Sequence, residues 1–351
     1  MNSTTLVRAD LVRLAHRGAG LRDFAFGATR ILARAVPFDG MCVAIMDPAT
    51  HVPTSSVLDN GPPPGSYGRL KEIEFGGEDF IAVPALALAD RRAAALSQAT
   101  GGVLERSLRH REIMRPHGFG DELRAALVGD GMVWGALMLV RGADREPFTE
   151  ADTALLEGMT AELAEGLRRT TLLDSEPADG EDAAGMLVLD PDGSTSFADE
   201  VAAGLLEELG GDPPVVVTAV AAQARLVAAG LGDGRIARAR VRAQSGRWLI
   251  VRASVLGDGH APVAVIIEPA RPHELAPLLA DAHRLTERER EVTQLVARGL
   301  STDEIAERLY MSPWTVQDHL KSIFEKVGVT SRGQLVARLF FGQGAPRLTD
   351  T

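Results

Sequence analysis

A row of polar side chains near the C-terminus is the strongest candidate for chemistry in this sequence. A helix that follows Ser312 turns by about 100° per residue, and this places six residues on one arc: Trp314, Gln317, Asp318, Lys321, Ser322 and Glu325. Most of them donate hydrogen bonds, accept them or carry charge, and packing does not require them. The major groove of DNA admits a helix, and its base edges present a distinguishable pattern of donors and acceptors. The arc therefore predicts a surface that reads DNA.

The opposite arc of the same helix predicts the face that holds it in place. It collects five apolar side chains: Val316, Leu320, Ile323, Phe324 and Val327. A stripe of this kind is buried against neighbouring elements. Lysine occurs only three times in the chain, and two of the three lie in this helix. This concentration favours a functional role for Lys321 over a merely solvated one.

Capping signals define the neighbouring helices. Each predicted helix start pairs a Ser or Thr with a Glu, Gln or Pro at the spacing of a cap: Thr286 with Glu289, Ser301 with Glu304, Ser312 with Pro313, and Ser331 with Gln334. Gly299 and Gly328 stand where the first and third helices should end, because a left-handed terminal residue is least costly for glycine. We expect four short helices here.

Residues 285–335 resemble the LuxR/NarL-type effector domain of bacterial transcription regulators. The likeness is carried by the motifs L-T-x-R-E-x-E-V, E-I-A-x-x-L, S-x-x-T-V-x-x-H and K-x-G-V-x-S-R, in that order. It implies an all-α, four-helix, helix-turn-helix domain, which we place at residues 285–345. It also implies that the helix after Ser312 enters the major groove and that the last helix pairs with a second copy.

Seven residues are the expected DNA contacts: Thr315, Gln317, Asp318, His319, Lys321, Ser322 and Arg332. The resemblance places Thr315, Lys321 and Arg332 where the family touches DNA. Gln317 stands where the family often has a basic residue, and Asp318 follows it, so the operator sequence is left open. His319 is expected to pack or to contact phosphate, since no cluster of metal-ligating residues surrounds it.

Two apolar stripes are candidate pairing surfaces between two copies of the chain. The final helix, 331–341, carries the expected dimer contacts: Leu335, Val336, Leu339 and Phe340. The second stripe lies on a long helix that Thr149 and Asp152 should cap: Leu155, Leu156, Met159, Leu163 and Leu167. We expect a homodimer.

The first 173 residues resemble a GAF domain. Residues 41–60 alternate as two strands about a turn, and Gly129-Asp130-Gly131 separates two apolar strands, 122–128 and 132–141. The segment GALMLVRGADREPFTEADTALLEGMTAELAEGL carries the likeness. It implies an α/β sensor domain that binds a small molecule or serves as a dimerising spacer. Cys42 is expected to be a small buried residue without a cofactor.

An acidic linker, 174–184, separates this region from a second sensor-like domain at 185–270. Two strands, helices and three further strands in that order resemble an α+β PAS domain. Arg238, Arg240 and Arg242 alternate on one strand face, which we expect to be solvated. An amphipathic linker helix, 271–284, then leads to the C-terminal domain. The fold class is therefore multidomain α+β with a C-terminal all-α domain.

Composition limits the class of protein. The chain has 351 residues and a net charge of -11; the ten basic and nine acidic residues from Arg284 onward give that part +1, so the remainder carries -12. One cysteine excludes an internal disulfide. No apolar run reaches the roughly 18 residues of a membrane helix, and we expect a soluble, cytoplasmic protein without cofactor or metal. No catalytic motif was found, so an enzyme is not expected.

These observations favour a DNA-binding transcription regulator that binds a roughly two-fold operator as a dimer. A small-molecule effector in the GAF-like or PAS-like domain and RNA polymerase are further candidate partners. The alternative is a sensor or scaffold protein that acts through protein contacts, for instance by sequestering another regulator. The sequence leaves the effector and the sign of regulation open.

Overall fold

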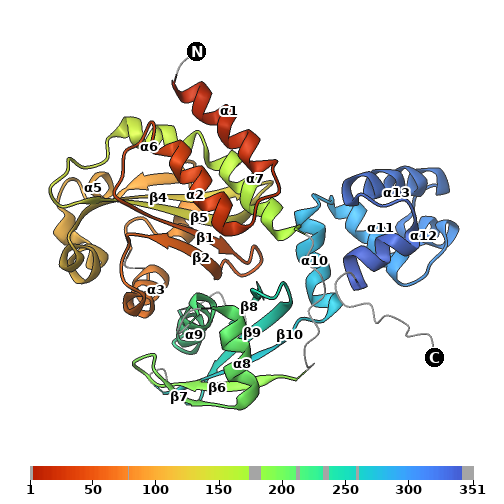
Figure 1. The fold of residues 1–351 in the computed structure, drawn as a ribbon. Helices are drawn as coiled ribbons and strands as arrows, with labels where there is room; N and C mark the ends of the chain where they lie inside the picture. Colours follow the sequence, from red (N-terminus) through yellow and green to blue (C-terminus); the bar gives the residue numbers. More distant parts are fainter. Residues whose placement is uncertain are drawn as a thin grey trace. The chain divides into compact units, whose positions relative to one another are not determined.

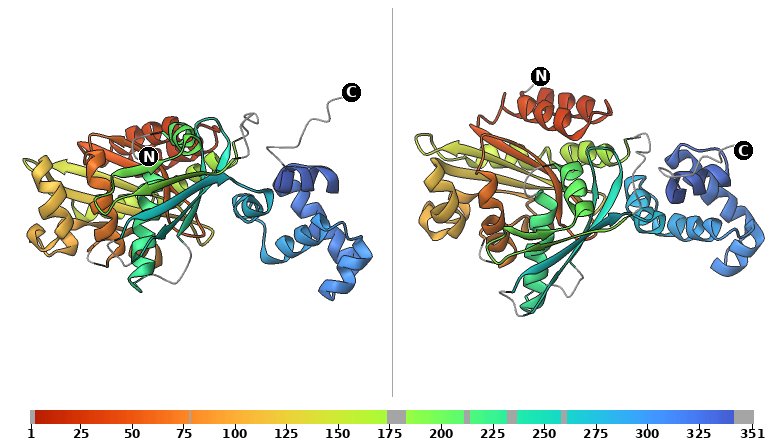
Figure 2. Two further views of the ribbon diagram at one scale, coloured as in Figure 1. Left: turned by 90° about the horizontal axis from the view of Figure 1, so that it is seen from below. Right: turned by 60° about the horizontal axis from the view of Figure 1, so that its bottom comes forward.

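The computed structural model describes residues 3–77, 79–173, 183–210, 214–231, 237–257 and 261–341. These residues form two compact units, which we describe separately. The first unit holds two antiparallel sheets, and the second holds helices only (Figures 1 and 2). Most of the predicted acidic linker, 174–182, lies outside the described residues.

The N-terminal sheet has five strands in the order β2-β1-β5-β4-β3. Their bounds are Gly40–Met46 for β1, Pro53–Asp59 for β2, Ala93–Ala95 for β3, Phe119–Gly129 for β4 and Met132–Gly142 for β5. The two predicted hairpins are confirmed. The second turns through Asp130 and Gly131, whose positive φ angles of 51° and 76° suit the Asp-Gly pair that tight hairpins favour.

Helices α1, α2 and α7 lie together over one face of the N-terminal sheet (Figure 1). Helix α6 contacts strands β3 and β4. The four helices are α1 Ser3–Ala15, α2 Leu21–Leu32, α6 Glu150–Glu157 and α7 Thr160–Thr171. The predicted capping box of Thr149 and Asp152 is confirmed. The predicted single long helix is wrong, because the chain breaks between α6 and α7 at Gly158 and Met159.

The apolar stripe on these two helices is therefore not a free pairing surface. Leu156, Met159, Leu163 and Leu167 are 0–3% exposed. A methyl group added at Gly135 of β5 would collide with Leu167, which shows how closely α7 sits on the sheet. The stripe is used within the domain, since a helix lying on a sheet must bury its apolar face there.

The opposite face of the sheet carries short helices. These are η1 Pro64–Ser66, α3 Tyr67–Phe75, α4 Val83–Leu88, α5 Leu96–Ala99, η2 Leu104–Arg106, η3 His110–Met114 and η4 Arg115–His117. Because side chains alternate along a strand, Ala136 faces this side while its neighbour Gly135 faces α7. The two faces are thus covered by different parts of the chain.

The second sheet repeats the strand order of the first. Its order is β7-β6-β10-β9-β8, which is again second-first-fifth-fourth-third along the domain. The elements are β6 Gly185–Leu189, β7 Thr195–Ala198, α8 Glu200–Leu209, α9 Val215–Ala228, β8 Arg238–Arg242, β9 Trp248–Val255 and β10 Val263–Pro269. The predicted order of strands is confirmed. Helices α8 and α9 bury their small apolar side chains against one face of this sheet.

The helical unit contains α10 Pro272–Ala282, α11 Glu287–Ala297, α12 Thr302–Leu309, α13 Pro313–Val327, α14 Arg332–Val336 and η5 Ala337–Phe341. The four predicted caps are confirmed, and each cap side chain accepts from the backbone N–H three residues on. Gly299 and Gly328 have positive φ angles of 82° and 72°, as predicted for helix ends. None of the described helices has the length and hydropathy that a membrane span needs.

Candidate functional site

Helix α13 presents the predicted polar arc to solvent. Helix α12 is followed by Tyr310, which has a φ of 55°, and the Ser312 hydroxyl then accepts from Thr315 N at 3.1 Å to start α13. Val316, Leu320, Ile323 and Val327 are 0–4% exposed and form the core face of α13. On the other side Trp314 is 74% exposed, and Gln317, Asp318, Lys321 and Glu325 are exposed as well. The division between a packed and an exposed arc is as predicted except at Ser322 and Phe324, which are half-buried.

Ser322 points into the domain rather than outward. Its hydroxyl donates to Glu289 Oε1 at 2.7 Å, and Lys326 Nζ lies 2.6 Å from Glu289 Oε2. Glu289 is 3% exposed. Burial works to raise its pKa, but the hydrogen bonds from Lys326, Ser322 and the Thr286 backbone outweigh it and lower the pKa of Glu289 to about 2. This ionised carboxylate joins α11 to α13 and already occupies the Ser322 hydroxyl.

Arg332 also has partners inside the domain. Its Nη1 donates to Leu300 O at 2.7 Å and its Nη2 to Thr302 Oγ1 at 2.8 Å. Gln317 Nε2 lies 3.3 Å from the same Thr302 oxygen. Arg332 therefore fixes the start of α12 against the start of α14, and Thr302 holds the Gln317 side chain in a defined position through a weak hydrogen bond.

The other predicted DNA contacts are more open. Asp318 and Lys321 are exposed and have no hydrogen-bond or ion-pair partner among the described residues. Thr315 is half-buried, and its hydroxyl lies 2.8 Å from that of Ser312. His319 is half-buried on the flank of α13. No cluster of three or more metal-ligating side chains occurs in the described part of the chain.

The predicted dimer residues fall into two groups. Leu335 and Leu339 are 0% and 2% exposed and belong to the core of the helical unit, where η5 also packs against α10. Val336 and Phe340 are half-buried. The final helix thus leaves less apolar surface open than its sequence predicts, since α10 covers part of it. Pairing through Val336 and Phe340 stays a prediction.

Comparison with known proteins decides the family. The model of "Bacterial regulatory proteins, luxR family" matches residues 283–339, and a GAF domain model matches residues 21–167. The spore germination protein GerE of Bacillus subtilis is 44% identical over 55 residues, which are 16% of this chain and 74% of GerE. This chain belongs to the luxR family. Its C-terminal residues form the helix-turn-helix domain of that family, and its N-terminal sheet is a GAF domain.

A further relative matches over a stretch of similar length. Mb0914c of Mycobacterium bovis, named as an HTH-type transcriptional regulator, is 54% identical over 52 residues, which are 15% of this chain but only 6% of Mb0914c. A crystal structure of Escherichia coli SdiA is 14% identical, covers 95% of this chain and 97% of SdiA, and has a TM-score of 0.34. A score of this size establishes no common architecture. The two matching family models cover residues 21–167 and 283–339 and leave out the central sheet domain, so its likeness to PAS domains rests on strand order.

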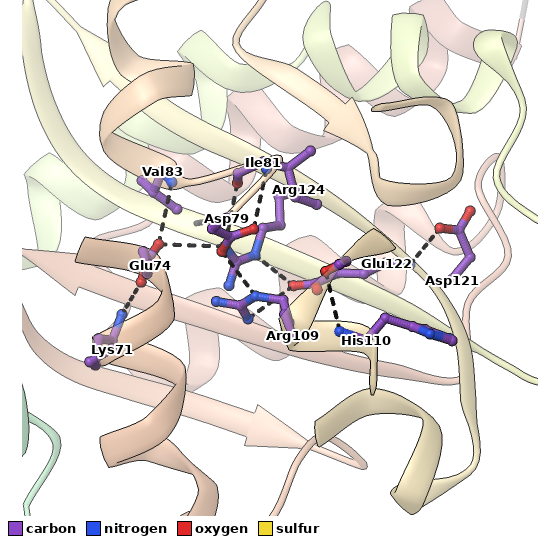
Figure 3. Close-up of polar contacts among 11 residues, drawn as sticks. Lys71, Glu74, Asp79, Ile81, Val83, Arg109, His110, Asp121, Glu122 and Arg124 are labelled. Carbon is purple, nitrogen blue, oxygen red and sulfur yellow. Dashed lines mark hydrogen bonds and ion pairs between the residues drawn. The ribbon is translucent and has the colours of Figure 1, made fainter. Parts of the chain in front are cut away.

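The GAF domain contains a buried group of charged side chains that the sequence patterns did not predict (Figure 3). We call it the charged cluster: Lys71, Glu74, Asp79, Arg109, Glu122 and Arg124. Arg124 lies 2.6 Å from Glu122, 3.0 Å from Asp79 and 3.5 Å from Glu74. All members but Lys71 have side chains at most 7% exposed. The sequence signal for this cluster is the presence of charged residues inside the apolar strand β4.

The carboxylates of the charged cluster are held in their ionised form. Burial works to raise the pKa of Glu74, yet Lys71, Arg124 and Arg109 shift it well below its usual range. The pKa of Asp79 is lowered against the same burial penalty by Arg124 and Arg109. Because both carboxylates stay charged, the ion pairs persist across neutral pH.

Arg240 corrects the prediction of a solvated arginine face on β8. Its Nε donates to Asp47 Oδ2 at 2.9 Å and its Nη2 to Asp47 Oδ1 at 2.5 Å, and the backbone N–H of Arg240 also donates to Asp47. The two side chains are 10% and 2% exposed. Burial works to raise the pKa of Asp47, but the hydrogen bonds and charge of Arg240 outweigh it. The pKa of Asp47 is therefore lower than usual. This bidentate pair joins the GAF domain to the central sheet domain.

Proposed function

We propose that this luxR-family chain is a transcription regulator that binds double-stranded DNA through the exposed face of α13. The observation that carries the proposal is the division of α13 into a buried arc and an exposed polar arc. Glu289 and Arg332 fix the surrounding helices from inside the domain. A rigid helix with free donors and acceptors on its outer face suits direct readout in the major groove.

Within this face the residues have different roles. Gln317 is a candidate for pairing with an adenine edge, because its amide presents both a donor and an acceptor. Its 3.3 Å contact with Thr302 is weak enough to be exchanged for a base contact. Lys321 is exposed and has no partner in the described part of the chain, so it is the candidate for a phosphate contact. Ser322 and Arg332 support the domain through their internal hydrogen bonds.

The proposed regulator acts as a homodimer on a roughly two-fold site. Val336 and Phe340, which the domain covers only in part, support pairing through the last helix. The GAF domain supplies the effector input, and RNA polymerase is the partner through which such a regulator changes transcription. DNA binding itself requires only the helix-turn-helix face.

A mobility-shift titration of the full chain at two salt concentrations tests this function. Genomic fragments are compared with random DNA of equal length. Phosphate contacts release counterions, so the affinity is expected to fall steeply between 50 mM and 200 mM salt. Preferred fragments should bind more tightly than random DNA at both concentrations. No binding to any fragment at 50 mM salt would support a regulator that acts through protein contacts alone.

A further inference from the structure

The GAF domain has a pocket on the sheet face opposite α7. It lies between β1 and β5 on one side and α3 on the other, and its cavity volume is about 80 Å³. One water molecule needs about 10–15 Å³ of such space, so the cavity is larger than a single solvent site. Ala44, Met46, Ala136 and Met138 contribute to a wall that is mostly apolar. The mostly apolar lining fits a small organic molecule rather than an ion.

The charged cluster limits the charge of that molecule. Lys71, Glu74, Arg109 and Arg124 line the pocket. With Asp79 and Glu122 behind them the cluster holds three cations and three carboxylates, a net charge of zero. A further buried charge would have no counter-charge left to pair with, and an unpaired buried charge is costly. The balance therefore favours a neutral molecule.

The other titratable groups on the wall add no charge. Burial raises the pKa of the Cys42 thiol to about 11 and that of the Tyr67 hydroxyl to about 12. Both groups stay protonated and neutral at pH 7. Among the described residues that line the pocket, the charged side chains all belong to the charged cluster.

One donor in the wall lacks an acceptor. Arg109 is 1% exposed, and its Nη2 has no hydrogen-bond partner among the residues that the structure describes, although its Nε donates to Asp79 at 3.0 Å (Figure 3). A buried donor without an acceptor is uncommon and carries a free-energy penalty. A carbonyl oxygen on a bound molecule would remove that penalty.

The central sheet domain forms part of the same wall. Val215 and Thr218 of α9 line the pocket beside the residues of α3. A Cβ added at Gly68 of α3 would lie 3.9 Å from the Thr218 methyl group, so the two helices are in close contact. The Asp47–Arg240 pair joins the same two domains. A molecule in the pocket therefore touches both domains.

The geometry points to a binding site for a neutral, mostly apolar small molecule that places a carbonyl oxygen on Arg109 Nη2 and packs against α9 of the central domain. This deepens the proposed function, because the bound molecule is the input of the regulator and its contacts with α9 tighten the docking of the two domains. Its contacts in the pocket do not involve α13.

Four probes of similar shape test the ligand class on the full chain without DNA. Acetophenone is neutral and has a carbonyl, ethylbenzene lacks the oxygen, benzoate is an anion and benzylamine is a cation. Dissociation constants are measured by calorimetric titration or, for weak binding, by ligand-observed NMR. Acetophenone should bind about tenfold more tightly than ethylbenzene, because its carbonyl oxygen accepts a hydrogen bond from a charged donor. Both charged probes should bind more weakly than ethylbenzene. Tightest binding by benzoate or benzylamine, or equal binding of the two neutral probes, overturns the assignment.

A pair of α9 variants tests the location. Thr218→Trp fills the pocket from the α9 side and should weaken acetophenone binding at least tenfold. Ala228→Trp adds the same side chain at an exposed position of α9 and should leave binding within twofold of the parent. Equal behaviour of the two variants overturns the role of α9, and thermal unfolding of each confirms that it is folded. Because the titrations contain no DNA, a failure of the proposed DNA binding would leave their outcome intact.

Discussion

In the GAF domain six charged side chains are bonded to one another and five of them are buried, whereas on α13 the polar side chains of one face stay exposed. Arg124 and Glu122 lie 2.6 Å apart with side chains 7% and 0% exposed. Lys321 lies on the surface with no ion-pair partner among the described residues. Residue type alone does not separate these two uses of charge.

The number of partners and the degree of burial distinguish the charged cluster from the polar face of α13. A buried charge with several partners cannot leave them without a large penalty, so it supports the domain around it. An exposed charge without partners loses little when it contacts a phosphate or a base edge. Glu289 links the two uses of charge, because it is a buried carboxylate and its bonds to Ser322 and Lys326 hold α13, which carries the exposed polar face.

The largest expected effect is on the charged cluster. Arg124→Met keeps an apolar stem but removes the guanidinium that pairs with Glu122, Asp79 and Glu74 together. We expect the free energy of unfolding of the GAF domain to fall by about 3–5 kcal/mol, as for other broken buried ion pairs. Urea unfolding followed by circular dichroism measures it. Arg91→Met is the control, because its pair with Glu150 has side chains 59% and 67% exposed. If both variants lost the same free energy of unfolding, burial would not distinguish the two ion pairs.

The next effect concerns Glu289. Glu289→Gln should lower the free energy of unfolding of the helical unit by about 2 kcal/mol, a figure reduced because Lys326 is 32% exposed. Glu291→Gln, which changes only an exposed pair with Arg288, should cost less than about 0.5 kcal/mol. The pKa of Glu289 is about 2 in the fold against an ordinary 4.5. Its contribution is therefore present above about pH 4.5 and is lost as the pH falls toward 2. A parent and variant with the same pH dependence in this window would contradict this assignment.

On the exposed face the effect should appear in binding rather than in stability. Gln317→Ala is expected to cost about 1–3 kcal/mol on the preferred DNA site and much less on random DNA. Gln294→Ala, at an exposed position of α11, should change neither affinity. Fluorescence anisotropy with labelled duplexes gives both dissociation constants. Equal losses of Gln317→Ala on both DNAs would show that Gln317 does not read bases.

The smallest effect is expected at Lys321. Lys321→Ala removes one phosphate contact, so the slope of log affinity against log salt should fall in magnitude by about 0.9 on every sequence. Arg288→Ala removes an exposed charge from α11, which lies outside the proposed face, and should leave the slope unchanged. An unchanged slope for Lys321→Ala would place this lysine off the DNA backbone.

Local signals predicted much of this structure. Alternating strands, the Gly-Asp-Gly turn and four helix caps each depend on residues within a few positions of one another. The two hairpins of the GAF domain and the caps at Thr286 and Ser301 were therefore correct. The helical wheel of α13 also separated buried from exposed side chains, since that division follows from its 3.6-residue period.

Partners far apart in the sequence were not predictable in this way. Arg240 and Asp47 are separated by 193 residues, and Ser322 and Glu289 by 33. A wheel assigns Ser322 to an arc but does not show which neighbouring helix carries its acceptor. Gly158 lies within an apolar pattern that reads as one long helix, and only the packing of α6 and α7 against the domain shows the break.

Trp314 gives the most direct test of α13 as the DNA-binding surface. It is 74% exposed on α13, whereas Trp134 is 2% exposed in the GAF domain. The full chain is titrated with its preferred duplex, and Trp314 emission is isolated by subtracting the Trp314→Phe variant. The account predicts that this emission changes in proportion to the bound fraction measured by mobility shift. A fully bound duplex with unchanged Trp314 emission would contradict it.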